Sequence, residues 1–576
     1  MVARPVSQRR DPQVRHALVA VVHTRLMMLM LLFAAAVVVV VARLAMLAIL
    51  GGGADAATRA TTLAGRGDIV DRNGAPLART IDAWTIAVHP KQLIGDPMEI
   101  AARLAALMPE RGDQAYFYGQ LTKDVSFTYL ERRASPALVE QVNAIGEPAL
   151  VFARETQRLY PQSTMAAHAL GFLSVDGHGM SGMERYLDAR LTNPATSGAP
   201  VALSIDTRVQ AAMESELGRA MSDYQAKGAA GIVMDVATGE VTAMVSLPIF
   251  NPNRVGMAGT EQLRNNVTQS VYELGSTFKP IAMAAAIDSG TVTSMARRFD
   301  ATAPLKIGRY SIHDDRGHEQ KRWLNIPETL IYSSNIATAR IANEVGPTRM
   351  QAMFRKLGFD TKPDVELKEK GRPLWPTYWA RTTVMTTAYG HGIAVTPLHL
   401  ASAYATMVNG GIWRPATLLR VAPGHAPRGR RVISEATSAR MRQLLRLIVL
   451  DGTGRKGEAP GYRVGGKTGT AEVAQAGGYA RNANVSTFAA AFPMDAPRYV
   501  VIAMLDSPKR VQANLFQTTA AYTAAPVVSR VISRTGAMLG VLPDASRDID
   551  ESDLTPLLWH APGTQGAATQ HDAGAE

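Results

Sequence analysis

Three short motifs, in a fixed order, supply the residue types that acyl transfer through a serine requires. Ser276-Thr277-Phe278-Lys279 comes first, Ser333-Ser334-Asn335 follows 57 residues later, and Lys467-Thr468-Gly469-Thr470 follows after another 134. A serine three residues before a lysine is expected about once by chance in a chain of this length. The ordered trio is much more specific, and its intervals leave room for a folded domain around it.

The first motif is expected at the start of a helix. The apolar run from Pro280 to Ile287 leads to Gly290, which predicts a helix that begins near Ser276 and is capped at its far end. On such a helix Lys279 lies one turn after Ser276, so the hydroxyl and the amine share a face within hydrogen-bond range. The backbone N–H of Ser276 would point out of the positive helix end, a suitable oxyanion donor.

Lys279 can act as a base only when it is neutral. At the ordinary lysine pKa of about 10.4, about one molecule in a few thousand is neutral at pH 7. Burial lowers a lysine pKa, and so does a second nearby cation, for which Lys467 is the candidate. We therefore expect the pKa of Lys279 to lie about three units below its ordinary value.

The trio is the signature of β-lactamases and penicillin-binding proteins. The match extends further, and residues 20 to 540 resemble a class B penicillin-binding protein of FtsI type. The other matching segments are Arg66 to Ala78, Arg158 to Pro161 with His168 and Gly171, Gly179 to Glu184, and Tyr389-Gly390-His391-Gly392 before Thr396-Pro397. Leu274 is a departure, because relatives often carry proline there.

The resemblance implies a peptidoglycan D,D-transpeptidase that cross-links peptide stems at the division septum and is a target of β-lactams. It implies that Ser276 is the nucleophile, that Lys279 is the base that activates it, and that Ser333 relays the proton toward the leaving D-Ala. Asn335 would hydrogen-bond the peptide stem.

The third motif would bind the donor, by the same resemblance. The substrate-binding residues would be Lys467, Thr468, Gly469 and Thr470, with the Thr470 N–H as second oxyanion donor. A substrate that ends in a carboxylate favours a lysine beside hydroxyl donors on an open strand edge. The glycines Gly465, Gly466 and Gly469 would let a substrate backbone approach closely.

Other residues have a simpler explanation. Ser276 standing alone would be a helix N-cap, and Ser333-Ser334-Asn335 a capping turn. We expect Glu184 and Asp71 to stabilise a non-catalytic domain. His391 could be a second base, but it lies in a glycine-rich turn, which favours a structural role.

Composition excludes several classes of function. The 576 residues are 47% hydrophobic, enough for two or more domains. The net charge of +12 is spread along the chain, so nucleic acid is not an expected partner. No metal-ligand cluster stands out and no cofactor is required. The absence of cysteine is consistent with export to an oxidising compartment.

The N-terminus predicts a membrane anchor. Residues 1–25 carry five arginines and precede an apolar run from Leu26 to Leu50 that only Arg43 interrupts. This predicts a cytoplasmic tail (1–25) and one transmembrane helix (26–50) in the inner membrane, with the catalytic domain in the periplasm. A cleaved signal peptide is the alternative, since Ala54-Asp55-Ala56 resembles a cleavage site, but its apolar core would be too long.

The rest of the chain predicts an α+β fold in two domains and a tail. A linker at 51–64 opens a mixed pedestal of the dimerisation type (51–225), and a transpeptidase domain (226–545) and a disordered tail (546–576) follow. A helix is expected over 206–227 and another over 518–538. Strands are expected at 231–235, 240–245, 463–473, 487–492 and 498–505. They favour an antiparallel sheet with helices on both faces, as in β-lactamases and penicillin-binding proteins.

Three alternatives remain at this point. A β-lactamase needs a base for hydrolysis, and no Glu-x-x-Leu-Asn segment lies between Asn335 and Lys467. An elongation-type transpeptidase would share every motif. A penicillin sensor or scaffold would keep the serine without turnover. For a septal enzyme, the resemblance implies peptidoglycan stems as substrates and an FtsW-type glycan polymerase and other divisome proteins as partners.

Overall fold

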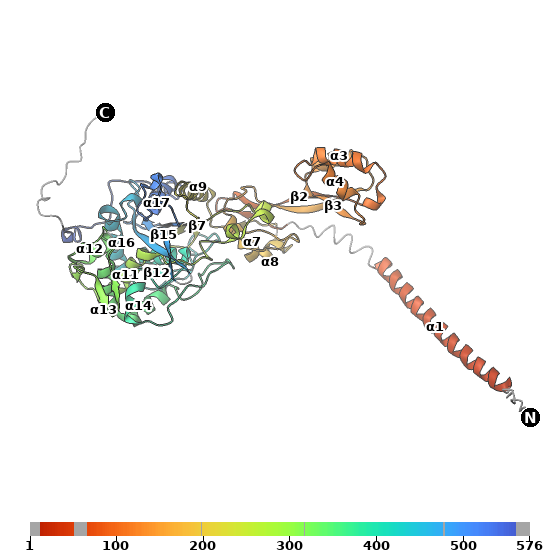
Figure 1. Ribbon diagram of the computed structural model, residues 1–576, viewed down its shortest axis with the longest axis horizontal. Helices are drawn as coiled ribbons and strands as arrows, with labels where there is room; N and C mark the ends of the chain where they lie inside the picture. The colour runs from red at the N-terminus through yellow and green to blue at the C-terminus, as the bar shows by residue number, and fades with distance from the viewer. Residues whose placement is uncertain (1–11, 51–65, 197, 316, 476–477, 560–576) are drawn as a thin grey trace, which may run out of the picture. The chain divides into compact units, whose positions relative to one another are not determined.

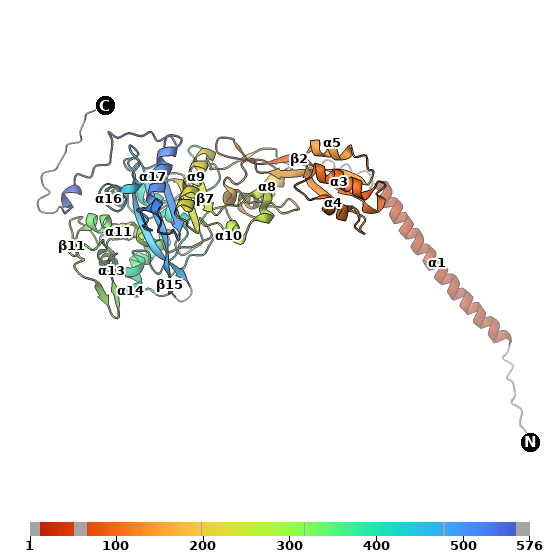
Figure 2. The same cartoon turned by 45° about the horizontal axis from the view of Figure 1, so that its top comes forward.

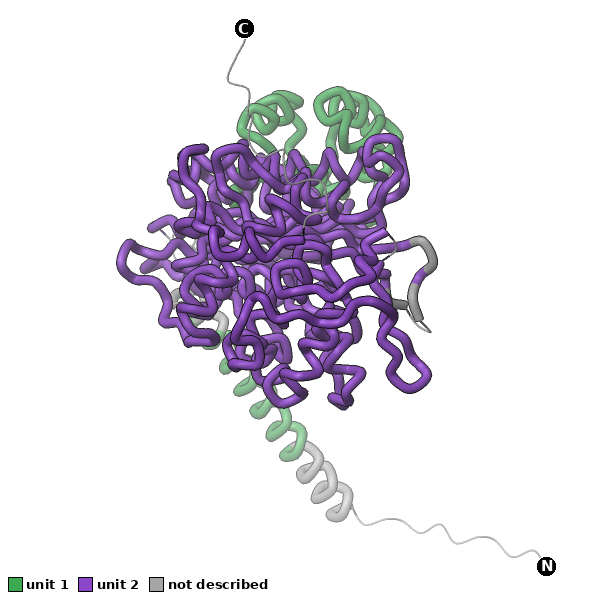
Figure 3. The backbone as a smooth tube through the Cα atoms, turned by 90° about the vertical axis from the view of Figure 1, so that its left-hand side faces the viewer, with its two compact units in different colours: residues 1–65, 83–156 green, residues 66–82, 157–576 purple. Residues whose placement is uncertain are grey.

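The computed structural model describes residues 12–50, 66–196, 198–315, 317–475 and 478–559. The predicted linker at 51–64 lies outside these ranges, as do the first eleven residues and the chain beyond 559. The chain forms two compact units, one of residues 1–65 and 83–156 and one of residues 66–82 and 157–576 (Figure 3).

The N-terminal helix α1 (Pro12–Leu50) contains the predicted membrane anchor. Its stretch Thr24–Arg43 is 20 residues long and apolar, and the stretch is not buried by the protein. At 1.5 Å per residue it spans about 30 Å, the thickness of a bilayer's hydrocarbon core. Within the described residues this is the one helix with the length and composition of a membrane anchor. The helix begins well before the predicted Leu26.

The first unit also contains a small α+β lobe with its own core. Three helices, α3 (Pro97–Leu107), α4 (Gln114–Leu121) and α5 (Pro136–Asn143), are capped by aspartate or serine side chains. Its strands are β3 (Thr128–Ala134) and the lobe parts of β2 (Pro76–Val88) and β4 (Leu150–Leu159). The buried core includes Ile86, Leu104, Phe117 and Leu130.

Buried ion pairs join distant segments of the pedestal that belong to the second unit. Glu184 is fully buried, and its carboxylate lies 2.6 Å from Arg66 Nε and 2.7 Å from Arg158 Nε. Asp71 is fully buried as well and accepts hydrogen bonds from the backbone of Asn73 and Ala75. The structural roles predicted for Glu184 and Asp71 agree with these contacts. Strand β1 (Ile69–Val70) pairs with β2 and, in parallel, with β5 (Val201–Ala202).

A five-stranded antiparallel sheet is the centre of the second unit, as predicted. The strand order is β14-β15-β16-β6-β7. The strands are β6 (Gly228–Asp235), β7 (Val241–Leu247), β14 (Gly465–Gln475), β15 (Gly478–Phe492) and β16 (Tyr499–Asp506). Because successive side chains of a strand point to opposite faces, the sheet contributes to two separate cores.

Helices cover both faces of this sheet (Figures 1 and 2). Helices α9 (Thr207–Asp223) and α17 (Ala524–Thr535) bury their apolar residues in one core. The other core takes residues of α11 (Lys279–Asp288), α13 (Asn335–Lys356), α15 (Pro397–Val408) and α16 (Glu435–Asp451). Asp206 caps α9 at the predicted start of that helix, whereas α17 begins six residues later than expected.

Short elements complete the two units. The helices are α6 (Ala167–Leu170), α7 (Gly182–Tyr186), α8 (Asp188–Thr192), α10 (Thr260–Leu263), α12 (Ile326–Ile331) and α14 (Arg381–Thr387). The strands are β8 (Phe299–Asp300), β9 (Leu305–Ile307), β10 (Tyr310–Ile312), β11 (Trp323–Leu324), β12 (Ile412–Trp413) and β13 (Arg430–Arg431). The 3₁₀ turns are η1 (Pro90–Gln92), η2 (Pro252–Met257), η3 (Gly275–Phe278), η4 (Arg455–Gly457), η5 (Gln512–Asn514) and η6 (Thr555–Leu557).

The prediction of a disordered tail from residue 546 is wrong for residues 546–559. Leu554 is fully buried in the larger core. Asp548 and Asp553 form ion pairs with Arg446 and Arg440 of α16, at 2.7 and 2.6 Å. Two of the acidic residues of this segment are thus the partners of arginines about 100 residues earlier.

Candidate active site

Ser276 lies in a 3₁₀ turn that leads directly into α11. The backbone N–H of Lys279 donates to the carbonyl oxygen of Ser276. Because side chains three residues apart eclipse in a 3₁₀ turn, Ser276 and Lys279 share a face, as predicted. Phe278 is fully buried and fixes the turn, with its ring 5.4 Å from Phe359. Tyr404 donates from its hydroxyl to the carbonyl oxygen of Thr277 at 3.0 Å.

The hydrogen bonds of Lys279 reach the second motif. Its Nζ donates to Ser333 Oγ at 3.0 Å and also to the carbonyl oxygen of Ser333. Among the described contacts none joins Lys279 Nζ to Ser276 Oγ, so the expected direct bond is not made in this structure. Catalytic hydrogen bonds are often long in unliganded sites and shorten once substrate is bound.

Burial shifts both lysines of the site toward the neutral form. Lys279 is fully buried, which lowers its pKa to about 8 against the opposing charges of Asp315 and Asp314. The pKa of Lys467 is lowered well below its usual range by burial and then by the charge of Lys279. With a pKa of about 8, about one Lys279 in ten is neutral at pH 7, which makes it a usable base.

The second motif forms a strained junction between α12 and α13. Ser333 has a φ of +57°, in the left-handed region that non-glycine residues rarely occupy. Ser334 caps α13 by accepting from Ala337 N at 3.1 Å and donates to the carboxylate of Asp314 at 3.0 Å. Asn335 donates to the carbonyl oxygen of His313 at 3.0 Å. The junction is therefore held from both sides.

Asp314 is a site residue that the sequence did not reveal. It is buried and also accepts from Ile336 N at 3.0 Å, at the positive end of α13. It lies two residues after the short strand β10 (Tyr310–Ile312) and belongs to none of the three motifs. A single aspartate outside any motif cannot be identified as a site residue from one sequence alone.

The third motif lies on β14, an edge strand of the catalytic sheet in the described chain. Lys467 Nζ donates to the carbonyl oxygen of Thr468 at 2.9 Å. Thr468 Oγ1 donates to Thr453 Oγ1 at 2.9 Å. Thr453 follows α16 in a Gly-Thr-Gly turn and was not predicted. Thr470 Oγ1 accepts from Ala520 N at 3.1 Å.

The glycines of β14 have close neighbours on the side where a Cβ would stand. A Cβ on Gly469 would lie 2.3 Å from the carbonyl oxygen of Leu274, and one on Gly466 would lie 2.6 Å from that of Ala489. A Cβ on Gly465 would meet the side chain of Met494 at 2.4 Å. The protein's own chain therefore fills the Cβ positions of these glycines, and close approach of a ligand backbone to β14 stays a prediction. Gly469 lets the third motif pack against the residue before the nucleophile turn.

One cavity of about 1080 Å³ collects residues of all three motifs. Ser276, Ser333, Thr468 and Thr470 lie on its wall. Lys279 and Lys467 are fully buried and hydrogen-bond to wall residues. Neither Asn335 nor Gly469 lines it, since they contact the chain at His313 and Leu274.

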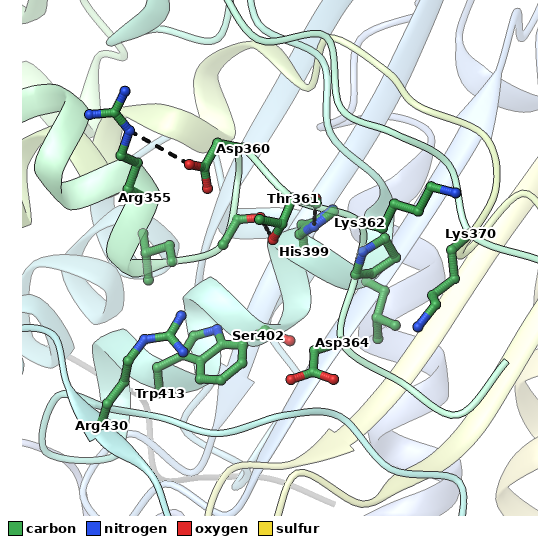
Figure 4. A pocket seen from close by; sticks show the side chains of 14 residues that line it. Arg355, Asp360, Thr361, Lys362, Asp364, Lys370, His399, Ser402, Trp413 and Arg430 are labelled. Atoms are coloured by element: carbon green, nitrogen blue, oxygen red, sulfur yellow. Dashed lines mark hydrogen bonds and ion pairs between the residues drawn. The ribbon is translucent and has the colours of Figure 1, made fainter. Parts of the chain in front are cut away.

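A second cavity of about 310 Å³ lies where α13 ends and α15 begins (Figure 4). Charged side chains of both signs surround it, including Arg355, Asp360 and Asp364. The guanidinium of Arg430 stacks 3.7 Å from the ring centre of Trp413. None of the predicted site residues lines this cavity.

Comparisons with known proteins agree with this site. A family model of the penicillin-binding protein transpeptidase domain matches residues 229–533, and one of the penicillin-binding protein dimerisation domain matches residues 61–195. The chain is 40% identical, over 83% of its length and 82% of the relative's, to a probable peptidoglycan D,D-transpeptidase FtsI of Caulobacter vibrioides. It is 28% identical to the peptidoglycan D,D-transpeptidase FtsI of Escherichia coli K12, over 87% of this chain and 88% of that one.

A solved structure of a penicillin-binding protein also matches this chain. The crystal structure of penicillin-binding protein 3 from Mycobacterium tuberculosis, complexed with aztreonam, superposes with a TM-score of 0.64 and 27% sequence identity. The match covers 83% of this chain and 97% of that one. The dimerisation-domain match covers most of the predicted pedestal, and the transpeptidase-domain match covers the three motifs that meet at the cavity. The chain belongs to the class B penicillin-binding proteins, the family of serine-type peptidoglycan D,D-transpeptidases.

Proposed function

We propose that this protein cross-links peptidoglycan stems at the division septum through an acyl-enzyme on Ser276. The observation that carries the proposal is the environment of Lys279. This lysine is fully buried, its pKa is lowered to about 8, and it contacts Ser333 on the wall of the cavity that Ser276 also lines. A neutral amine on the same face as the serine is what acylation by a serine requires.

In the acylation step, Lys279 takes the proton of Ser276 Oγ as the oxygen attacks the carbonyl carbon of the donor's terminal D-Ala-D-Ala bond. The carbon–nitrogen bond then breaks, and the proton passes through Ser333 Oγ to the leaving D-Ala amine. The 3.0 Å hydrogen bond between Lys279 Nζ and Ser333 Oγ supports this route. The second step transfers the acyl group to an amine of another stem.

The third motif has a binding role in this proposal. Lys467, Thr468 and Thr470 recognise the donor's terminal carboxylate, while Asn335 positions the peptide stem. The backbone N–H groups of Ser276 and Thr470 stabilise the developing oxyanion, a contribution of about 3 kcal/mol per donor in comparable sites. Gly469 serves this arrangement indirectly, because it lets β14 approach the nucleophile turn.

The septal role rests on the similarity to two FtsI proteins and on the predicted anchor. In this proposal α1 spans the inner membrane once and the catalytic domain lies in the periplasm. The partners are an FtsW-type glycan polymerase, contacted through α1 and the pedestal, and other divisome proteins.

The experiment is depletion of the protein, complemented by wild type or by Ser276→Ala, with labelled penicillin added to membranes of each strain. Wild type forms a long-lived covalent adduct and restores division. The Ser276→Ala variant forms no adduct and leaves cells filamentous. Both variants are checked for equal abundance by immunoblot.

Each alternative has its own outcome. Rounded cells on depletion identify the elongation-type enzyme, and rapid release of hydrolysed penicillin identifies a β-lactamase. Normal division with Ser276→Ala, despite loss of the adduct, identifies a sensor or scaffold. A penicillin adduct that persists in Ser276→Ala contradicts the site assignment itself.

A further inference from the structure

The loop Tyr389-Gly390-His391-Gly392 is built onto the nucleophile turn. A Cβ on Gly390 would lie 2.3 Å from the carbonyl oxygen of Gly275, so the two backbones are in contact. The carboxylate of Glu273, three residues before Ser276, accepts from Gly392 N at 3.1 Å. This loop therefore has a fixed position relative to Ser276.

His391 faces both this carboxylate and the active-site cavity. Its Nδ1 lies 3.6 Å from Glu273 Oε2, and its side chain is 33% exposed. His391 lines the same cavity as Ser276 and Ser333. A carboxylate beside Nδ1 favours the tautomer in which Nδ1 carries the hydrogen and Nε2 carries the lone pair, as in other carboxylate-oriented histidines.

The transfer step releases two protons, one more than the route through Lys279 and Ser276 carries. The acceptor amine of a peptide stem is an ammonium at neutral pH, and it loses two protons when it becomes an amide. One proton passes through Lys279 to Ser276 Oγ as the ester carbon–oxygen bond breaks. The other must leave before attack, since an ammonium has no lone pair, and Lys279 has no further capacity for it.

We propose that His391, oriented by Glu273, accepts this first proton from the acceptor ammonium. The amine nitrogen then forms its bond to the ester carbonyl carbon, and the imidazolium, stabilised by the Glu273 carboxylate, releases its proton to solvent. The inference rests on the proposed transfer to an amine. It implies that the acceptor binds in the part of the cavity next to His391 and that its reacting group is a strongly basic primary amine.

Other charged groups share this environment. Tyr389 lies beside His391, with ring centres 5.3 Å apart. The remaining titratable or charged side chains of the cavity wall come from five other segments: Asp315 and His318, Arg455 and Lys456, Glu472, Lys509 and Arg510, and Tyr522. The carboxylate of Glu273 lies against the His391 ring, with Oε2 3.6 Å from Nδ1.

The test separates acylation from transfer. Purified full-length protein in detergent is acylated with labelled penicillin to measure the first step. Transfer is measured with a D-Ala-ending thioester donor and either of two acceptors at pH 7: a D-amino acid, whose amine is protonated, or hydroxylamine, which is already neutral. His391→Gln removes the base, and His318→Gln is the matched control on the same cavity wall.

His391→Gln is expected to lower transfer to the D-amino acid by about 10- to 100-fold, the usual contribution of a general base. Penicillin acylation and transfer to hydroxylamine stay at wild-type rates. Glu273→Gln, which keeps an acceptor for Gly392 N, gives a smaller loss with the same acceptor selectivity. His318→Gln resembles wild type in all three assays.

Two results overturn the assignment. Wild-type transfer to the D-amino acid by His391→Gln shows that another group takes the proton. A parallel loss of penicillin acylation shows that His391 positions Ser276 instead. By contrast, a wild-type enzyme that is acylated but transfers to neither amine refutes the proposed transfer reaction, and the inference with it.

Discussion

At the scale of single residues, the protonation of Lys279 limits acylation. Burial lowers its pKa to about 8, while the negative charges of Asp315 and Asp314 raise it and so limit the shift. Since Lys279 acts as a base when neutral, acylation by penicillin should rise about tenfold per pH unit below this pKa and level off above it. Asp315 lines the cavity, accepts a long hydrogen bond of 3.5 Å from Asn335 Nδ2 and caps no helix, and asparagine keeps an acceptor oxygen for Asn335.

Asp315→Asn should therefore make acylation faster at pH 7. Removing the negative charge disfavours the ammonium form of Lys279, lowers its pKa and moves the rising limb of the pH profile to lower pH. We expect roughly threefold faster adduct formation at pH 7 and no change above pH 9. The measurement is the rate of labelled-penicillin incorporation between pH 5.5 and 9.5.

Glu472→Gln is the control for Asp315→Asn, because Glu472 is another carboxylate of the same cavity wall. It does not contribute to the pKa of Lys279. Identical pH profiles for Asp315→Asn and wild type would show that Lys279 does not limit the reaction.

The sequence predicted the residues of this site better than their contacts. The types and order of the motifs were enough to select Ser276, Lys279 and Lys467. The bond from Lys279 to Ser333 and the repulsion between the two lysines require distances across more than 50 residues. Spacing within one helix determines only which residues share a face.

At the scale of elements, three backbone segments meet at the nucleophile turn through glycines. Gly275 has a φ of +55°, and a Cβ there would lie 2.8 Å from the carbonyl oxygen of Thr470 on β14. Gly390 packs on Gly275, and Gly469 packs on Leu274. The turn that presents Ser276 is thus held between the edge strand and the loop after α14.

Gly390→Ala should disturb this contact. Its Cβ would lie 2.3 Å from Gly275 O, and the position has a φ of +82°. We expect penicillin acylation to fall by about tenfold or more, because a displaced nucleophile loses about 1.4 kcal/mol or more of transition-state stabilisation. The rate of adduct formation and the melting temperature measure the two effects.

Gly392→Ala is the matched control two residues away. Its φ of +76° gives a similar backbone strain, about 1 kcal/mol, but the nearest atom to its Cβ is Thr386 Oγ1 at 3.7 Å. Gly392→Ala should lower the melting temperature slightly and keep acylation near wild type. Equal acylation defects in both variants would contradict a specific role for the contact between Gly390 and Gly275.

Local patterns predicted the elements of the sheet and failed at contacts between distant segments. The near-continuous apolar runs of β6, β7, β16 and the end of β15 fit strands with two covered faces, so type and approximate position were predictable. The tail from 546 to 559 has few apolar residues, and its order depends on Leu554 and on ion pairs with α16. No local pattern contains that information.

At the scale of the whole molecule, the lobe of residues 83–156 and the catalytic unit have separate cores. The lobe core contains Ile86, Leu104 and Phe117, and none of its buried residues belongs to the two cores of the catalytic unit. The predicted pedestal of 51–225 combined this lobe with segments that pack in the second unit. Composition could not separate them, because the boundaries of the lobe fall inside β2 and β4, which pair with each other.

The lobe also exposes aromatic and aliphatic side chains that its own core does not use. Tyr129 is 50% exposed and Phe127 is 40% exposed, with ring centres 4.8 Å apart, and Ile94 is 79% exposed. Exposed aromatic pairs of this kind are common at the centre of protein interfaces. We expect the lobe to serve partner binding and the catalytic unit to serve acylation.

Replacing residues 83–156 by a short Gly-Ser linker should separate these two properties. Because β2 and β4 pair, a few residues can join Asp82 to Gln157, and all three catalytic motifs remain. The shortened protein should form the penicillin adduct at a rate close to wild type but fail to restore division in depleted cells. Full-length Ser276→Ala is the complementary control, since it keeps the lobe and loses the adduct. Restored division by the shortened protein would show that partners are bound without the lobe, and loss of the adduct would show that the catalytic unit depends on the lobe to fold.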